Sequence, residues 1–328
     1  MKIAFASCIN THAYPDQPVW KNIASHNPDV LLLLGDNIYL DIPWVEIVAS
    51  VPVHPADASD QDFLRHGHKL YQELLSQPDF LTLITRPNLL SYAIWDDHDF
   101  LWNDAAGGAI SKVVQGGKMR ASAALHWQFR EALRNKNPSM FPSNFTDPVL
   151  CNPNETAPGY SCIDLGNDLY LHLTDGRSFR TAHTMLGSTQ RDQISDAIQE
   201  HGSGIHLIAA GNVVRASNGE RWEAYPEDYQ WLLNIAAHHK ILVFSGDIHK
   251  NYLPDPLKLV GGPISWLHEA TSSGAAIGHE LLVQAGKQKH NFGIADIDFG
   301  NRTININLHK DADGSTEYSR QINIAAWA

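Results

Sequence analysis

The sequence predicts an α/β fold with helices outside and sheets inside, on three observations. Residues 30–34 are five consecutive apolar residues, Val-Leu-Leu-Leu-Leu, a pattern typical of a strand covered on both faces, although a buried helical segment has the same local pattern. Similar short runs alternate with segments of helical spacing along most of the chain. The last part instead alternates apolar and polar residues with the two-residue period of antiparallel strands.

The strands follow from short apolar runs and the helices from apolar residues three and four positions apart. The predicted strands are 3–6, 30–34, 90–95, 162–165, 169–174, 206–210, 241–244, 264–270, 292–299, 303–308 and 317–324. The predicted helices are 20–26, 60–77, 79–85, 118–134, 188–201 and 226–239. Ser59 or Asp60 is expected to cap the helix at 60–77, and Ser188 or Thr189 the helix at 188–201.

Two long connections lack such patterns. Residues 41–59 contain three prolines and are expected to be irregular, and the Gly/Ala-rich segment 105–117 is expected to form a flexible lid. Gly166-Asn167-Asp168 predicts the turn of a hairpin between the strands on either side. No repeat or composition shift marks a boundary, so residues 1–328 are predicted to form one domain.

Composition limits the partners. The 36 acidic residues exceed the 24 basic ones, for a net charge of −12, which argues against nucleic acid or an anionic membrane as partner. An anionic substrate would be repelled by this charge unless bound cations reversed it locally. No apolar run approaches membrane-spanning length and no signal-peptide pattern opens the chain, so a cytoplasmic protein is expected unless a leader was removed. Composition leaves the oligomeric state open.

Three cysteines do not make a disulfide framework. Cys151 and Cys162 lie close in sequence and could form a bridge in an oxidising compartment. Cys8 would then remain single at the end of a predicted strand, where a metal ligand is a better interpretation than a disulfide partner.

The chemistry is concentrated where predicted strands end. Six apolar runs finish on side chains with oxygen, nitrogen or sulfur atoms, and parallel strands present such residues at one edge of a sheet. Together these endings predict a shared metal-binding edge. They are Ser7-Cys8, Gly35-Asp36, Asp96-Asp97-His98-Asp99, Thr174-Asp175-Gly176-Arg177, Gly211-Asn212 and Ser245-Gly246-Asp247-Ile248-His249.

In this order the motifs resemble those of the alkaline phosphatase D (PhoD-like) family, a branch of the calcineurin-like metallophosphoesterases. The resemblance rests on Ser7-Cys8, Gly35-Asp36-Asn37-Ile38-Tyr39, Ile94-Trp95-Asp96-Asp97-His98-Asp99 and Ser245-Gly246-Asp247-Ile248-His249. Weaker similarities are Asp175-Gly176-Arg177, His268-Glu269-Ala270-Thr271-Ser272-Ser273-Gly274 and Asn291-Phe292-Gly293-Ile294-Ala295-Asp296. The resemblance implies a four-layer α/β/β/α sandwich and hydrolysis of a small anionic phosphate ester, a monoester or a diester, by a metal-bound hydroxide.

The resemblance also implies a role for each matching residue. Asp36 is expected to bridge two metals, and the ligand set is Cys8, Asp36, Tyr39, Asp97, Asp247 and His249. Thiolate, phenolate and carboxylate together favour Fe3+, accompanied by Ca2+ or by Mg2+, Mn2+ or Zn2+. His98 is expected to protonate the leaving oxygen, Asp99 to fix the His98 tautomer, and Arg177 to hold the phosphate.

Each role has a simpler structural alternative. Cys8 and Tyr39 are equally typical of buried packing residues, and Asp97 of a turn or helix cap. His98 could pack, Asp247 and His249 could form a polar turn, and Arg177 could pair with a neighbour such as Asp175. Asn103 and Asn212 are weaker candidates for metal or phosphate contact, because asparagine is common in turns. Trp95 and Trp102 are expected to line the site or to pack.

Two other functions fit part of the pattern. A non-catalytic protein could use the same scaffold to bind a metal or a phosphoryl ligand. A hydrolase could use Cys8 as nucleophile, but no nucleophile elbow or phosphate-binding loop surrounds it.

Overall fold

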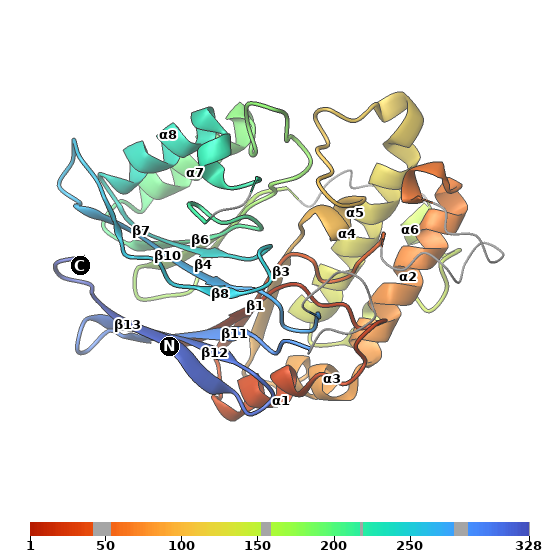
Figure 1. Cartoon of the computed structure of the whole chain (residues 1–328), viewed down its shortest axis with the longest axis horizontal. Coiled ribbons are helices and arrows are strands. Elements are labelled where there is room, and N and C mark those ends of the chain that lie inside the picture. The colour runs from red at the N-terminus through yellow and green to blue at the C-terminus, as the bar shows by residue number, and fades with distance from the viewer. Residues whose placement is uncertain (42–53, 152–158, 217–218, 279–287, 328) are drawn as a thin grey trace.

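The computed structural model describes residues 1–41, 54–151, 159–216, 219–278 and 288–327. Two sheets pack face to face, and helices cover the outer face of each (Figure 1). Three apolar clusters correspond to the three interfaces between these layers. The predicted four-layer α/β/β/α sandwich is therefore confirmed. That the whole chain forms one domain stays a prediction.

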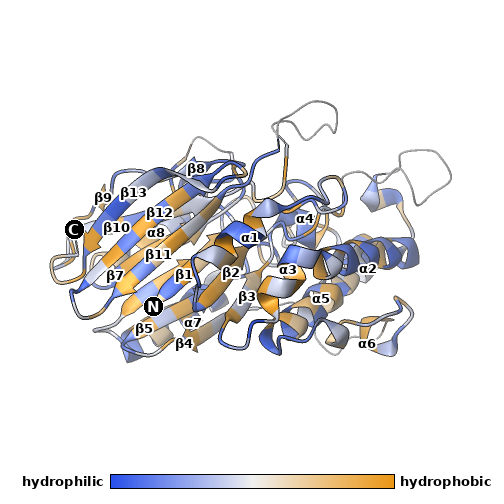
Figure 2. Ribbon diagram, turned by 90° about the horizontal axis from the view of Figure 1, so that it is seen from below, coloured by the Kyte–Doolittle hydropathy of each residue, from blue (hydrophilic) through white to orange (hydrophobic). Residues whose placement is uncertain are grey.

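The first sheet has the strand order β13-β12-β11-β1-β2-β3. β1, β2 and β3 are parallel, with Ile3 opposite Val30 and Val30 opposite Leu90, whereas β11, β12 and β13 are antiparallel. Figure 2 shows apolar and polar residues alternating along these late strands. The bounds are β1 Lys2–Ala6, β2 Val30–Leu34, β3 Leu90–Ile94, β11 Phe292–Asp298, β12 Thr303–Lys310 and β13 Ser315–Asn323.

The second sheet has the order β4-β5-β6-β7-β10-β8, with β9 paired to β10. β5, β6, β7 and β10 are parallel, and β4 forms the predicted hairpin with β5. The bounds are β4 Ser161–Asp164, β5 Leu169–Leu173, β6 Ile205–Ala209, β7 Lys240–Ser245, β8 Asn251–Tyr252, β9 Leu257–Lys258 and β10 Trp266–Ser272.

The helices lie in two groups. α1, α2, α3 and α5 contribute to the apolar cluster on the outer face of β1–β3, and α7 and α8 cover the second sheet (Figure 1). The bounds are α1 Pro18–Ser25, α2 Asp60–Ser76, α3 Pro78–Ile84, α4 Asp97–Phe100, α5 Lys112–Arg134, α6 Pro148–Cys151, α7 Ser188–Glu200 and α8 Pro226–Ala236.

The apolar run 30–34 forms the strand β2, and its burial on both faces explains why every residue in it is apolar. Leu31 and Leu33 face the helices, whereas Val30, Leu32 and Leu34 face the second sheet, and all five are fully buried. A strand with apolar neighbours on both faces loses the polar alternation of a half-exposed strand. Both faces of β2 are therefore held by the core, which fixes the position of Gly35 and Asp36 at its end.

Two local predictions were wrong, and a third held only in part. The helix α5 begins at Lys112 inside the predicted lid, because Gly117 allows close approach of α2: a β-carbon there would lie 1.6 Å from an oxygen of Asp60. The N-cap of α7 is Gly187 rather than Ser188 or Thr189. The strand β10, predicted as antiparallel at 264–270, pairs antiparallel with β8 and β9 but in parallel with β7, and it is buried along nearly its whole length.

The remaining predicted elements agree with the structure to within a few residues. Ser59 caps α2, its hydroxyl accepting a hydrogen bond from the Asp62 N–H at 3.1 Å. Cys151 and Cys162 are both free thiols. Most of the segment 41–59 lies outside the described residues. No helix in the described part of the chain is long and apolar enough to cross a bilayer.

Candidate metal centre

The candidate site lies where parallel strands of both sheets end. β1, β2 and β3 end just before Ser7, Gly35 and Trp95, and β7 of the other sheet ends just before Gly246. The glycines bring these ends close together: a β-carbon on Gly35 would lie 2.6 Å from the Asp96 side chain, and one on Gly246 would lie 2.5 Å from the Ser7 hydroxyl. The two sheets thus share one edge, as the sequence predicts.

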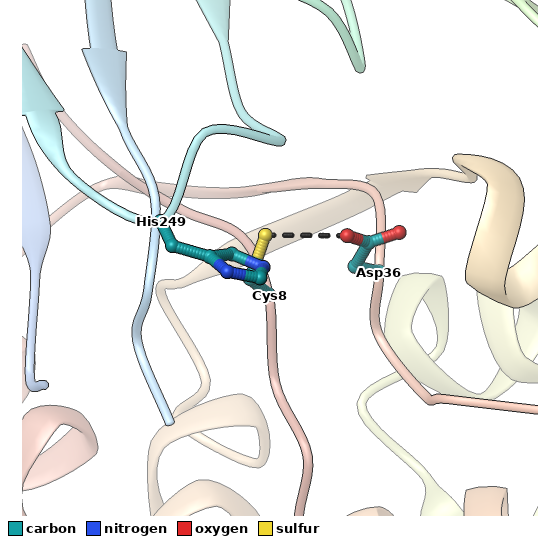
Figure 3. A group of neighbouring side chains, drawn as sticks. All are labelled: Cys8, Asp36 and His249. Carbon is teal, nitrogen blue, oxygen red and sulfur yellow. Dashed lines mark hydrogen bonds between the residues drawn. The ribbon is translucent and has the colours of Figure 1, made fainter. Parts of the chain in front are cut away.

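Cys8, Asp36 and His249 form the first group of candidate ligands, with their ligand atoms all within 4.8 Å of one another. Figure 3 shows the Cys8 sulfur directed at the Asp36 carboxylate, with the His249 ring beside it. The sulfur lies 3.2 Å from Asp36 Oδ2. The Tyr39 hydroxyl lies 3.4 Å from the same oxygen and 3.1 Å from His249 Nε2. Four predicted ligands therefore converge.

The backbone at this site adopts the left-handed region at non-glycine residues. The φ angles are +61° at Cys8, +50° at Asp36, +71° at Asp247 and +50° at His249. Such residues cost about 1–3 kcal/mol each and cluster where surrounding structure over-determines them. Here the Asp36 carbonyl accepts the Ile9 N–H at 2.7 Å. Four of the six predicted ligands share this strained conformation, which points to a functional constraint on their side-chain directions.

Asp36 also belongs to a second group, with Asp97 and His98. Asp36 is buried, and its Oδ1 has no hydrogen-bond partner among the described residues. An unpartnered carboxylate oxygen is costly in a protein interior unless a cation or a proton neutralises it. Because Asp36 contributes to both groups, its carboxylate would be the ligand shared by two cations if both groups were occupied.

The pKa values of these groups indicate a site built for cations. Burial and the neighbouring Cys8 raise the pKa of Asp36 well above its usual range, and burial raises the pKa of both Cys8 and Tyr39. Burial together with Asp96 and Asp97 raises the pKa of Asp247 to about 7. Bound cations would displace these protons and remove the repulsion between the carboxylates. The donor set therefore fits metal ions.

Asp97 differs from the other acids because it has positive neighbours. Burial alone would raise its pKa, but Arg177 and His98 outweigh burial and hold the pKa below its usual range. Its oxygens accept the backbone N–H groups of Asp104 at 2.7 Å and of His98 at 3.1 Å. The Asp97 carboxylate is therefore held in a fixed orientation, among positive groups that favour its ionised form.

His98 is paired with Asp41, not with Asp99 as predicted. His98 Nδ1 lies 2.5 Å from Asp41 Oδ1, and the other Asp41 oxygen accepts the Asn103 N–H at 2.8 Å. Burial opposes the charged imidazole, but Asp36 and Asp97, together with the hydrogen bond to Asp41, raise the pKa of His98 well above its ordinary value. The imidazole therefore lies among carboxylates that favour its protonated form.

Asp99 instead holds the loop after β2. Its Oδ1 accepts the N–H groups of Asn37 at 2.9 Å and Ile38 at 3.2 Å, and its Oδ2 accepts the Asp96 N–H at 3.1 Å. These bonds orient the carboxylate toward backbone donors of α4 and of the neighbouring loop. Sequence proximity to His98 suggested the wrong partner, because adjacent helical residues point in different directions.

Arg177 forms buried ion pairs, and its predicted role as a phosphate clamp is not supported. Its Nε donates to Asp96, and its two terminal nitrogens donate to Glu220 at 3.0 and 2.6 Å. The guanidinium is fully buried, and a terminal nitrogen lies 3.5 Å from Asp97. Asp175 is not its ion-pair partner, since Asp175 Oδ1 accepts the Arg177 backbone N–H.

The pair of arginines extends this network across both sheets. Arg180 donates to Glu220 at 2.7 Å and to the Asn212 side-chain oxygen, and Asn212 in turn donates to Asp247 at 3.3 Å. Continuous polar contacts therefore connect Asp96, after β3, with Asp247, after β7. We name Asp96, Arg177, Arg180, Glu220 and Asn212 the arginine clamp. It holds candidate ligands from both sheets in one arrangement.

Replacing Glu220 with alanine should reduce the free energy of unfolding by about 3 kcal/mol, because two buried guanidinium groups would lose a shared carboxylate. Urea unfolding of the metal-free protein measures this loss. Glu223→Ala is the matched control: its half-exposed carboxylate pairs with Arg221 at 3.0 Å, and such pairs contribute about 0–1 kcal/mol. Equal losses in both variants would show that the clamp contributes no more than a surface ion pair.

Several residues of the site were missed or ranked low from the sequence. Glu220 and Asp104 form a third acidic group with Asp97. Neither follows an apolar run, so strand endings gave no signal for them, and Asp41 was assigned only to an irregular segment. The Asn103 side-chain amide donates a hydrogen bond to the Asp104 carboxylate at 2.8 Å. Trp95 is buried and donates to Asp175 at 2.8 Å, and Trp102 packs against the first apolar cluster, so both pack.

Comparison with known proteins decides the family. A family model described as PhoD-like phosphatase matches residues 3–293. The chain belongs to the PhoD-like phosphatase family. It is therefore a phosphoester hydrolase by family, and the family implies metal cofactors, in agreement with the ligand groups. A comparison with curated proteins found no match.

Comparison with solved structures found chains with different degrees of similarity to this PhoD-like chain. The structure of PhoD has a TM-score of 0.60 at 16% identity, covering 98% of this chain and 71% of that one. TT1561 of Thermus thermophilus has a TM-score of 0.39 at 11% identity, covering 98% of each chain. Vps29 of Entamoeba histolytica, as a double mutant, has a TM-score of 0.36 at 11% identity, covering 98% and 99%. Of these three, PhoD alone is similar enough to support the fold.

Proposed function

We propose that this PhoD-like protein hydrolyses small phosphomonoesters or phosphodiesters at a centre of at least two cations. The observation that carries the proposal is the Asp36 carboxylate, which is buried, shared by two ligand groups and without a hydrogen-bond partner at Oδ1 in the described part of the chain. When bound, such cations supply Lewis acidity toward the phosphoryl oxygens and lower the pKa of water at the site.

The two ligand groups favour different metals. Cys8, Tyr39 and His249 with Asp36 supply sulfur, phenol, imidazole and carboxylate atoms, a set suited to Fe3+. Asp36 and Asp97, with His98 beside them, supply mainly oxygen, which suits Ca2+ or another divalent cation such as Mg2+, Mn2+ or Zn2+. Asp247 lies next to Asn212 and is proposed to complete the shell from β7.

His98 is the proposed general acid. Asp41 holds Nδ1, so the proton available to a leaving oxygen would be the one on Nε2, and His98 lies in the same ligand group as Asp36 and Asp97. Arg177 and Arg180 are already paired within the arginine clamp. The negative charge of the phosphoryl group would therefore be neutralised by the cations and by His98. This division explains how a protein of net charge −12 could bind an anionic ester.

The test combines metal reconstitution with two substrates. The metal-stripped protein is reloaded with Fe3+, Ca2+, Mg2+, Mn2+ or Zn2+, singly and in pairs, and assayed on p-nitrophenyl phosphate and bis(p-nitrophenyl) phosphate. Hydrolysis of either ester with a defined metal content supports the proposal. Phosphate binding without turnover under every condition would identify a non-catalytic binding protein instead. A colourless, fully active protein without iron would refute the assignment of Fe3+ alone.

A further inference from the structure

Ser273 lies between two candidate ligands that come from different sheets. It directly follows β10 and is fully buried. Its hydroxyl oxygen lies 3.1 Å from the Cys8 sulfur and 2.9 Å from the His249 backbone nitrogen. Figure 3 shows Cys8 and His249 side by side. One hydroxyl therefore contacts a residue after β1 and a residue after β7.

Chemistry fixes the direction of the hydrogen bond from His249, and the direction of the other follows when Cys8 is a thiolate ligand. The His249 N–H can only donate, so the Ser273 oxygen accepts there. The hydroxyl proton of Ser273 then remains for the Cys8 sulfur, which is an acceptor when it is a thiolate ligand. A hydrogen bond to a metal-bound thiolate reduces the electron density that the sulfur donates to the metal.

The backbone conformations of Cys8 and His249 are strained and have to be held by contacts with neighbouring residues. Cys8 and His249 adopt left-handed φ angles, at +61° and +50°. The His249 N–H is held by Ser273 and its carbonyl by the Lys289 ammonium. Ser273 is held in turn, since its own carbonyl accepts the Asn291 side-chain amide at 2.7 Å. The segment after β10 thus braces the backbone from which the His249 ring extends.

We propose that Ser273 is a positioning residue of the metal centre: its hydroxyl fixes the Cys8 sulfur relative to His249 and tunes that sulfur as a metal ligand. The inference rests on the proposed metal-dependent function and extends it to a residue that binds no metal itself.

Ser272 offers a matched control on the neighbouring position. It is also fully buried, but its hydroxyl donates to the Asn251 side-chain oxygen at 2.8 Å. Successive residues at the end of a strand face opposite sides, so alanine at Ser272 removes the same atom without removing the contact with Cys8. Any general cost of deleting a buried hydroxyl appears in both variants.

The experiment titrates Co2+ into metal-stripped wild type, Ser273→Ala and Ser272→Ala. Competition with a chromophoric chelator gives the affinity, and the near-ultraviolet thiolate-to-cobalt band reports on the sulfur. Ser273→Ala should bind Co2+ about 10–100-fold more weakly, because the Cys8 sulfur is no longer fixed relative to His249. The band should shift to lower energy, because the sulfur loses its hydrogen bond. Ser272→Ala should match the wild type in both.

The outcomes separate this inference from the proposed function. An unchanged affinity and band in Ser273→Ala, or the same change in Ser272→Ala, would overturn the role of Ser273 while leaving the metal centre intact. A wild type that binds Co2+ without any thiolate band, or binds none, would overturn the Cys8 ligand group and the inference together.

Discussion

Asp36→Asn is expected to reduce hydrolysis of p-nitrophenyl phosphate by about 1,000-fold or more, with loss of bound metal. The substitution keeps the shape of the side chain but removes the charge that both ligand groups share. Losing about 4 kcal/mol of transition-state stabilisation corresponds to three decades in rate, within the several kcal/mol that metal ions contribute. Steady-state kinetics and elemental analysis of the same preparation measure the two effects.

The same variant should be more stable than wild type when metals are removed. Burial raises the pKa of Asp36, so the folded metal-free protein favours the protonated carboxyl and loses stability as the pH rises above the ordinary range of an aspartate. Asparagine removes this loss. Asp36→Asn should therefore unfold at a higher temperature at pH 8 without metal, and the difference should shrink toward pH 4. Added metal should stabilise wild type far more than the variant.

Asp196→Asn is the control, since Asp196 is exposed on α7. It should leave activity, metal content and stability unchanged. Full activity of Asp36→Asn with normal metal content would remove the central support of the proposed function. Lost activity accompanied by lower stability without metal would show that misfolding caused the loss.

His98→Asn is expected to lower kcat by about 100–1,000-fold on an alkyl phosphate and much less on p-nitrophenyl phosphate. An alkoxide needs a proton as it leaves, whereas p-nitrophenolate is stable without one. Asp41→Asn should show the same dependence on the leaving group with a smaller loss, because Asp41 orients His98 through Nδ1. Parallel assays of both esters with matched metal loading measure the ratio.

Asp99→Asn distinguishes the two candidate partners of His98. Asp99 accepts backbone N–H groups of the loop after β2 and of Asp96, so its replacement should lower the unfolding temperature without changing the alkyl-to-aryl ratio. If Asp99→Asn changed that ratio and Asp41→Asn did not, the assignment of Asp41 would be wrong. Equal losses on both esters in His98→Asn would indicate a metal ligand rather than a proton donor.

Much of the fold was predictable because the burial of a strand or helix determines the pattern of apolar residues in its own sequence. The run 30–34 is apolar at every position since both of its faces are covered, and the hairpin at β4 and β5 follows from its turn residues. The start of the helix α5 was mispredicted, because a distant contact decided the outcome. Gly117 was taken as a source of flexibility, but it allows close packing against Asp60.

The candidate site was predictable only in part, for a similar reason. Cys8, Asp36 and His249 each follow an apolar strand, so their common edge could be inferred from three separate endings. The role of Arg177 could not, because whether a guanidinium is free depends on partners such as Glu220, 43 residues further along the chain.

The sequence by itself determined which atoms stand at the strand ends: sulfur, carboxylate, phenol and imidazole in a fixed order along the chain. Only the tertiary structure decided which of these residues contact one another. Asp36 belongs to two ligand groups, His98 is paired with Asp41, and Arg177 forms ion pairs with Asp96 and Glu220. The physical reason is that strand formation depends on neighbouring residues, whereas contacts across two sheets depend on how the apolar faces between them pack.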